Sequence, residues 1–301
     1  MTYLLPMEPQ VATAPFDHPD YLFQIKWDGI RCLATITEEG MMLRSRNGKD
    51  MSKQFPEIVN SPFFSSGRSK TIVDGELVVL DRDGLPSFPL VLKRHRFQKA
   101  SSIEEGRKVY PVLYMIFDLL QWQNQSFLEH PLEKRLAKLE RELVPSNHIV
   151  FTKAEEAAGI AFFQSIQKLN LEGMVGKDRN SLYRPGKKAR TWKKVKNFRQ
   201  LSCFVIGFTQ SQEGQIASLA LGLPLENTWQ YIGKVGTGIS QKEARLWYVR
   251  LHPQQMKEST TEVKKQGYHK VHQPYPIIVQ YLEWTQDLRL RHPSLLSTIE
   301  P

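Results

Sequence analysis

Cysteine is scarce in this sequence of 301 residues, which contains only Cys32 and Cys203. The two form no CxxC pair and have no zinc-ligand spacing, so a reducing, cytosolic setting is favoured. Residues Met1–Pro6 lack a charged start followed by a long apolar run, and no secretory signal is visible. No apolar stretch approaches the roughly 20 residues that a membrane span needs. We therefore expect a cytoplasmic protein that is neither secreted nor membrane-bound.

Acidic residues are in the minority. There are 31 Asp and Glu against 41 Lys and Arg, which gives a formal charge of +10 and a pI near 9.5. Such an excess of positive charge indicates a polyanionic partner, most often nucleic acid, although it also serves general solubility. Hydrophobic residues make up 41% of the chain, enough for a real core, so disorder is not expected. The length suits one large domain or two ordinary ones.

The first two-thirds of the chain contain neither internal repeats nor a regular βαβ alternation. Short runs rich in β-branched and aromatic residues predict strands at Tyr21–Lys26, Arg31–Thr37, Met41–Arg46, Thr71–Leu80, Val112–Leu119 and Gly173–Lys177. A helix is predicted after Pro131, where leucines recur at helical spacing, and a second from about Ala154 to Leu169. This pattern indicates an α+β fold.

The character of the sequence changes near Asn197. Strands are predicted at Cys203–Thr209, Ile216–Leu223, Trp229–Val235 and Ile277–Trp284. One helix interrupts them, with Ser240 and Glu243 as a capping box ahead of it. Several short strands with one helix favour a small barrel of the OB-fold type. We expect two domains, residues 1–198 and residues 199–301.

The cluster Lys26-Trp-Asp-Gly-Ile-Arg31 lies where one predicted strand ends and the next begins. A lysine at such a point can be desolvated and flanked by cations, which makes its neutral amine available as a nucleophile. Gly29 permits close approach of a ligand, and Arg31 can reach phosphate or ribose oxygens. The alternative is an ordinary polar turn, because Asp-Gly is a strong hairpin signal by itself.

Acidic residues interrupt strands that should be buried. Glu76 follows Asp74 in the apolar run Thr71–Leu80, and Asp118 follows Phe117 in another. Buried acids are unfavourable unless they are paired or bind a ligand, so Glu76 is a candidate for a ribose hydroxyl or a metal. Phe117 can stack on a base or belong to the core. Glu172 is a candidate oxygen ligand for Mg²⁺, or a surface turn residue.

Basic residues form two further candidate sites. If residues 190–196 are a strand, Trp192, Lys194 and Lys196 share one face, and the two lysines form a phosphate clamp. The alternative is a solvated basic run that touches a DNA backbone. Near the C-terminus, Arg289 and Arg291 also share a face if extended, and they either contact a triphosphate or decorate the tail.

The order of these motifs resembles the covalent nucleotidyltransferase superfamily, which includes DNA ligases, RNA ligases and mRNA capping enzymes. The matching motifs are Lys-x-Asp-Gly-x-Arg at 26–31, Asp-Gly-Glu at 74–76, Phe-Asp at 117–118, Glu-Gly at 172–173 and Trp-x-Lys-x-Lys at 192–196. The stretches 43–48, 54–58, 233–238 and 290–294 look like ATP-dependent DNA ligases of bacterial end joining, the ligase D type. The resemblance implies an adenylation domain of antiparallel sheets with flanking helices, followed by an OB-fold domain.

The resemblance also implies a role for each matching position. Lys26 would form the lysine–AMP intermediate, Arg31 and Glu76 would hold the sugar, and Phe117 would stack on adenine. The remaining assignments are Glu172, with Glu76, for the Mg²⁺ or Mn²⁺ ion, Lys194 and Lys196 for the α-phosphate, Arg46 for a nick phosphate, and Arg289 and Arg291 for pyrophosphate. Gln24 and Ile25 would line the nucleotide site. Many relatives have a glutamate at the position of Gln24, two residues before the lysine, and use it to read the adenine amino group. With glutamine there, a backbone carbonyl can still accept a hydrogen bond from that amino group.

The expected reaction is ATP-dependent sealing of nicked duplex DNA by a monomer in the bacterial cytoplasm or nucleoid. A Ku-like end-binding protein or a repair polymerase is the expected protein partner, by analogy with the family. Three alternatives stay open at this point. They are an RNA ligase, a capping enzyme that prefers GTP, and a non-enzymatic DNA-binding module on an inactive scaffold.

Overall fold

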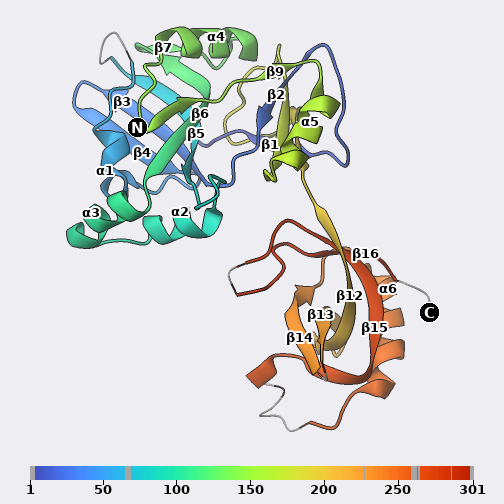
Figure 1. Cartoon of the computed structure of the whole chain (residues 1–301). Coiled ribbons are helices and arrows are strands. Elements are labelled where there is room, and N and C mark those ends of the chain that lie inside the picture. Colours follow the sequence, from blue (N-terminus) through green and yellow to red (C-terminus); the bar gives the residue numbers. More distant parts are fainter. Residues whose placement is uncertain are drawn as a thin grey trace. The chain divides into compact units, whose positions relative to one another are not determined.

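Figure 1 shows the computed structural model, which describes residues 4–64, 69–226, 228–258, 263, 265–285 and 287–298. The chain divides into two compact units, Met1–Asn197 and Phe198–Pro301. Each unit has its own hydrophobic core, and each core contains one of the two free cysteines, Cys32 or Cys203. No helix among the described residues is long and apolar enough to cross a membrane.

The larger sheet of the first unit holds the strands with the buried acids. Its strand order is β4-β3-β5-β6-β7, with β8 paired to β6. The strands are β3 (Ile30–Thr37), β4 (Gly40–Ser45), β5 (Thr71–Val79), β6 (Val112–Trp122), β7 (Gln125–Ser126) and β8 (Ile149–Phe151). All neighbours are antiparallel except β6 and β8.

The second sheet of this unit has the order β1-β11-β10-β2-β9. Its strands are β1 (Glu8–Val11), β2 (Tyr21–Ile25), β9 (Glu155–Glu156), β10 (Gly173–Asp178) and β11 (Lys188–Lys196). The pairs are antiparallel except β1 with β11, which run parallel. Because β2 belongs to this sheet and β3 to the other, the residues between Ile25 and Ile30 carry the chain from one sheet to the next.

Short helices cover these sheets. They are η1 (Ser52–Gln54), α1 (Pro56–Val59), α2 (Phe88–His95), α3 (Ala100–Val109), α4 (Leu132–Glu142) and α5 (Gly159–Lys168). Helix α4 follows Pro131 as expected and buries Leu132, Leu136 and Leu139, and it packs on β6. Helix α5 starts later than the expected Ala154, because Glu155 and Glu156 instead pair with β2 as β9.

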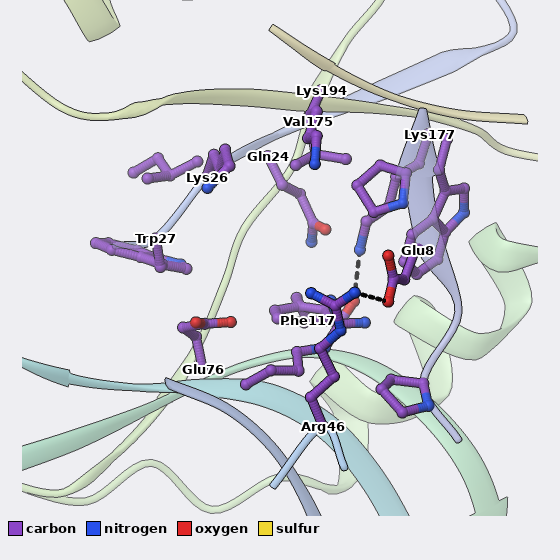
Figure 2. Close-up of a pocket in the computed structure, with 15 residues that line it drawn as sticks. Glu8, Gln24, Lys26, Trp27, Arg46, Glu76, Phe117, Val175, Lys177 and Lys194 are labelled. Carbon is purple, nitrogen blue, oxygen red and sulfur yellow. Dashed lines mark hydrogen bonds and ion pairs between the residues drawn. The ribbon is translucent and has the colours of Figure 1, made fainter. Parts of the chain in front are cut away.

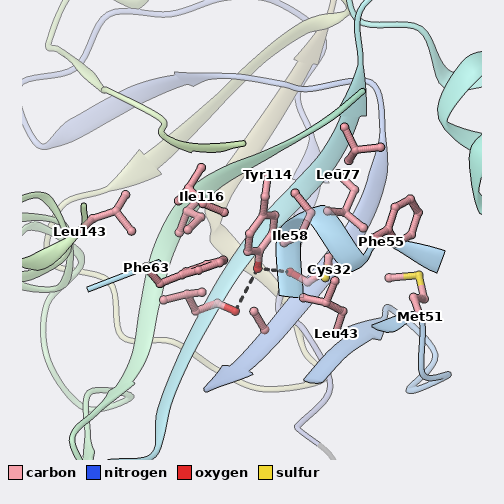
Figure 3. Packing of buried hydrophobic residues seen from close by; sticks show 14 of the residues in the cluster. Cys32, Leu43, Met51, Phe55, Ile58, Phe63, Leu77, Tyr114, Ile116 and Leu143 are labelled. Carbon is pink, nitrogen blue, oxygen red and sulfur yellow. Dashed lines mark hydrogen bonds between the residues drawn. The ribbon is translucent and has the colours of Figure 1, made fainter. Parts of the chain in front are cut away.

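The core of the first unit also holds its buried polar groups in fixed positions. Tyr114 lies in this core (Figure 3) and donates a hydrogen bond from its hydroxyl to the Cys32 carbonyl at 2.8 Å. Asp118 accepts bonds of 2.7 and 3.0 Å from Arg135, and both side chains are fully buried. The acid that interrupts β6 is therefore satisfied by a bidentate ion pair with α4, which joins helix and sheet.

The second unit is a five-stranded antiparallel sheet with the order β14-β13-β12-β15-β16. Its elements are β12 (Arg199–Gln210), β13 (Ile216–Leu225), β14 (Thr228–Val235), α6 (Gln241–Leu251), η2 (His252–Gln254), β15 (His269–Tyr281) and β16 (Ser294–Thr298). A parallel bridge between Thr237 and Ser294 connects the two ends of the sheet, which closes it into a barrel. The expected capping box of Ser240 and Glu243 is present at the start of α6.

Candidate active site

A cavity of about 200 Å³ opens in the first unit, and its walls come from both sheets (Figure 2). Most of the predicted site residues line it, namely Gln24, Ile25, Lys26, Arg31, Arg46, Glu76, Phe117 and Lys194. The other lining residues are Pro6, Glu8, Pro9, Trp27, Val175, Lys177 and Trp192. The motifs that are spread along the sequence therefore meet at one place.

Lys26 follows the last residue of β2, where the chain leaves the second sheet. Its backbone N–H donates to the Gly173 carbonyl at 2.9 Å, and its Nζ donates to a carboxylate oxygen of Glu172. Burial raises the pKa of Glu172, and the neighbouring Lys26 partly opposes this shift. The predicted nucleophile thus has a carboxylate with elevated basicity as its direct partner.

Arg31 lines the cavity and is held rigidly. Its Nε and Nη2 donate to the two oxygens of Asp74 at 2.6 and 2.7 Å, and Nη2 also donates to the Met7 carbonyl at 3.2 Å. Asp74 is fully buried and additionally accepts the Tyr183 hydroxyl at 2.6 Å. Asp74 is consequently committed to fixing Arg31, in keeping with the strength of bidentate pairs.

Glu76 lies opposite Arg31 in the β3–β5 ladder, so the two side chains share a face of the sheet. Burial raises the pKa of Glu76 to about 8, against the opposing influence of Arg31 and Lys26. A carboxyl group in this state can donate or accept a hydrogen bond near neutral pH.

Gln24 is almost completely buried in the wall of the cavity. Its Nε2 donates to the Thr152 carbonyl at 2.8 Å, which fixes the orientation of the amide. Its Oε1 is buried and has no hydrogen-bond partner in the described part of the chain. An unpaired buried acceptor is unfavourable, so this oxygen is a position at which a bound ligand can donate a hydrogen bond.

Lys177 is a cavity residue for which the sequence predicted no role. It is 2% exposed, and its Nζ donates to the Phe117 carbonyl at 3.2 Å. The same Nζ lies 4.4 Å from the centre of the Phe117 ring and 4.1 Å from that of Trp192. Burial lowers the pKa of Lys177 to about 7, although Asp118 opposes the shift. Phe117 also lies beneath the Arg31 guanidinium, 4.6 Å from ring centre to Cζ.

The lysines of β11 occupy different positions. Lys194 lines the cavity with Trp192, and its pKa is lowered by burial and by the nearby Lys26 and Lys196. Lys196 is not among the lining residues. Lys196 lies opposite Gly173 in the β10–β11 ladder, and Gly173 directly follows Glu172 in the chain. The positive charge of Lys196 therefore acts on the Glu172 carboxylate and partly opposes the rise that burial causes in its pKa.

Arg46 lies at the rim of the cavity, where its side chain is 62% exposed. It forms an ion pair with Glu8 of β1, which is drawn in Figure 2. Exposed ion pairs of this kind are weak. Arg46 is therefore easily released to another anion, in contrast to the buried Arg31.

Arg289 and Arg291 belong to the second unit, and each has its own partner there. Arg289 donates to the Tyr231 carbonyl and lies 4.5 Å above the Tyr231 ring. Arg291 donates to Glu283 at 2.6 Å. The two side chains therefore bind different groups within this unit.

Glu8, Trp27 and Lys177 are cavity residues that were not predicted from the sequence. Trp27 and Lys177 lie inside motifs that were recognised, so their position beside Lys26 and at the end of the Glu172–Lys177 stretch was an available signal. Glu8 had no such signal, because it reaches the site only through the pairing of β1 with β11.

Two family models match the chain. The ATP dependent DNA ligase domain matches residues 8–196, and the ATP dependent DNA ligase C terminal region matches residues 212–299. The multifunctional non-homologous end joining DNA repair protein LigD of Mycobacterium tuberculosis is 29% identical over 282 residues, which cover 91% of this chain and 35% of that protein. A DNA ligase of Thermococcus onnurineus is 30% identical over 235 residues, which cover 73% of this chain and 41% of that protein.

The solved structures agree with these matches. The crystal structure of the ligase domain from M. tuberculosis LigD is 25% identical and aligns with a TM-score of 0.57, covering 98% of this chain and 95% of that domain. The chain spans about a third of the length of the LigD proteins that it matches.

The predicted α+β architecture, an adenylation domain followed by an OB-fold domain, is confirmed by the family matches and the structural alignment. The first family model alone covers more than half of the sequence. The chain belongs to the ATP-dependent DNA ligase family.

Proposed function

We propose that this chain is an ATP-dependent DNA ligase core that seals breaks in duplex DNA through a lysine–AMP intermediate, in end-joining repair. Residues 1–198 would form the adenylation domain and residues 199–301 the OB-fold domain. The observation that carries the proposal is the convergence of Lys26, Arg31, Glu76, Phe117 and Lys194 on one cavity in a chain of this family.

Lys26 would carry the nucleotide. Attack of its neutral amine on the α-phosphorus of ATP forms a nitrogen–phosphorus bond and breaks the bond to pyrophosphate. The amine must first lose a proton, and Glu172 is the acceptor that its Nζ contacts. Because burial raises the pKa of Glu172, this carboxylate is a stronger base than an exposed one.

Two later transfers would use the same cavity. AMP moves from Lys26 to the 5′-phosphate of a nick, which breaks the nitrogen–phosphorus bond, and the 3′-hydroxyl then displaces AMP. Each step concentrates negative charge at phosphorus, which positioned cations stabilise. Lys194 and Lys196 would act on the α-phosphate and Arg46 on the nick phosphate. Arg289 and Arg291 would act in the first step, on the leaving pyrophosphate.

The base would be read by the wall of the cavity. The unpaired Gln24 Oε1 accepts a hydrogen bond, which suits the 6-amino group of adenine and not the 6-oxygen of guanine. Phe117 would stack on adenine, Ile25 lines the same cavity, and Arg31 with Glu76 would hold the ribose. This arrangement favours ATP over GTP.

A divalent ion, Mg²⁺ or Mn²⁺, fits the donor set. Glu76 and Glu172 are largely buried carboxyl groups with raised pKa values, a state that a nearby cation relieves. The described residues contain no group of three or more side chains placed to hold a metal. This suits an ion that takes its other ligands from phosphates and water. When bound, it would neutralise charge on the phosphates.

We further propose that the enzyme acts as a monomer in the bacterial cytoplasm or nucleoid. Its formal charge of +10 supports binding to nicked duplex DNA through the phosphate backbone. A Ku-like end-binding protein or a repair polymerase would bring it to breaks, by analogy with the family. The name of the M. tuberculosis relative states end joining and DNA repair.

The test is covalent labelling with α-labelled ATP or GTP and Mg²⁺, beside Lys26→Ala. We expect label from ATP in the wild-type chain, loss of label in the variant, and transfer of AMP to nicked DNA followed by sealing. Label from GTP alone would assign the chain to capping-type chemistry instead. Preferential sealing of RNA nicks would make it an RNA ligase. No label after pretreatment with pyrophosphate, which strips bound AMP, would contradict any lysine–nucleotide mechanism.

A further inference from the structure

Thr152 lies outside the cavity and is almost completely buried, with 3% of its surface exposed. It follows directly after β8. Its backbone N–H donates to the Ile116 carbonyl at 2.8 Å, one residue before Phe117 on β6. The position of Thr152 is therefore set by its bond to β6, the strand that also carries Phe117, the predicted base-stacking residue.

Two different atoms of Thr152 bind the chain on the two sides of Lys26. The Thr152 carbonyl accepts from Gln24 Nε2 at 2.8 Å, and the Thr152 hydroxyl accepts from the indole Nε1 of Trp27 at 3.0 Å. Gln24 lies two residues before Lys26, and Trp27 follows it directly. One residue that follows β8 thus binds both flanks of the predicted nucleophile.

These contacts act at the place where the chain crosses between the sheets. Lys26 itself is held there by its backbone bond to Gly173 and by the ion pair of its flexible side chain with Glu172. The indole of Trp27 is large and partly buried, so a bond to its N–H restricts the orientation of the peptide next to Lys26. A shift of about 1 Å in a reacting group can slow a reaction by roughly a hundredfold.

We propose that Thr152 is a positioning residue for Lys26, acting through the hydrogen bond of its hydroxyl to Trp27. This inference rests on the proposed function, because it assumes that Lys26 accepts the nucleotide. Thr152 would not touch the substrate. Its hydroxyl would hold Trp27, and through Trp27 the backbone that aims the Lys26 amine.

The reaction sequence makes this role separable from a general effect on folding. Lys26 takes part in formation of lysine–AMP and in transfer of AMP to the nick. It forms and breaks no bond in the final step, in which the 3′-hydroxyl displaces AMP from DNA. A residue that acts by positioning Lys26 should therefore slow the first step and leave sealing of pre-adenylated nicked DNA unchanged.

The experiment compares Thr152→Val, which removes the hydroxyl at nearly constant shape, with Thr152→Ser, which retains it. At saturating ATP we expect Thr152→Val to form lysine–AMP roughly tenfold more slowly or worse, with little change in KM for ATP. Its sealing of pre-adenylated nicked DNA should stay within about twofold of wild type, and Thr152→Ser should restore the first step.

Thr71→Val is the matched control, because Thr71 is also a buried threonine and its hydroxyl accepts from the Gln123 N–H at 3.2 Å, away from the cavity. Trp27→Phe tests the same bond from its other end and remains informative if Thr152→Val does not fold. It should reproduce the loss, and the double variant should lose no more than either single variant.

Normal lysine–AMP formation by Thr152→Val, equal slowing of both steps, or additive losses in the double variant would each overturn the inference while leaving the proposed function intact. If the wild-type chain forms no lysine–AMP, the proposed function fails and this inference fails with it.

Discussion

The side-chain amide of Gln24 forms a hydrogen bond through its nitrogen but has no described partner for its oxygen. The Nε2 donates one hydrogen bond to the Thr152 carbonyl and the Oε1 is buried without a described partner, so this oxygen is ready to accept a hydrogen bond. We expect Gln24→Met, which removes the acceptor at similar size, to lower kcat/KM for ATP by roughly 10- to 100-fold and to reduce the preference over GTP.

The control for this change is Gln24→Glu, which keeps an acceptor oxygen and should retain the preference for ATP. The measurement is the rate of lysine–AMP or lysine–GMP formation at several nucleotide concentrations. An unchanged ATP-to-GTP ratio in Gln24→Met would show that another group reads the base.

Lys177 should make stability depend on pH. Burial lowers its pKa from 10.5 to about 7, so between these values the unfolded chain binds the proton more tightly than the folded chain. The stability of the wild type relative to Lys177→Met should therefore rise from pH 7 towards pH 10, and the charged lysine should disfavour folding most at and below pH 7.

Urea unfolding of both proteins at several pH values measures this difference. Lys168→Met, at an exposed lysine near the end of α5, is the control and should show no such trend. A constant difference between wild type and Lys177→Met across this range would contradict a lowered pKa.

At the scale of single residues, the sequence predicted the side chains that line the cavity better than the residues that hold them in place. Lys26, Arg31, Glu76 and Phe117 stand in short motifs whose chemistry is legible without a structure. Thr152 has no such motif, because its partners are 125 and 128 residues away along the chain. A role that depends on a tertiary contact at that separation leaves no local pattern in one sequence.

Strand β10 depends on Gly173, whose φ is +155°. A Cβ at this position would lie 2.2 Å from the Val195 carbonyl oxygen of β11, and the Gly173 carbonyl accepts the backbone bond from Lys26. We expect Gly173→Ala to destabilise the first unit by about 2 kcal/mol or more and to slow lysine–AMP formation.

Gly84→Ala separates backbone strain from collision, because Gly84 also has a positive φ, +77°, but no atom within 4 Å of a new Cβ. It should cost about 1 kcal/mol and leave the lysine–AMP rate unchanged. Urea unfolding and the labelling rate provide both readouts. Equal effects of the two substitutions would mean that the contact with β11 is unimportant.

Among the elements, strands with an uninterrupted apolar pattern were predicted well and the others were not. The expected strand at Ile277–Trp284 in fact begins at His269, because Pro274 and Pro276 interrupt the strand pattern that the sequence displays. Helices α2 and α3 were missed. Their weakly apolar segments, which include Pro89 and Gly106, carry little helical signal and depend on packing against the rest of the unit.

The formal net charge of the whole chain, both domains together, is +10. Contacts with DNA phosphates release counterions, so affinity for nicked duplex should fall by roughly a hundredfold or more between about 50 and 200 mM salt. Anisotropy of a labelled nicked duplex measures this, with an intact duplex of the same sequence as the control. Affinity that is flat over this range would argue against backbone-dominated binding.

The two cysteines give the molecule an internal reporter. Cys32 is buried in the core of the first unit and Cys203 in that of the second, and burial raises the pKa of Cys203 to about 12. Neither thiol should react with an alkylating reagent until its own unit opens. The alkylation rates of the two cysteines, measured by mass spectrometry of the same sample, would therefore report the opening rates of the two units separately. One would report the opening of the first unit, with the proposed nucleotide site, and the other the opening of the barrel.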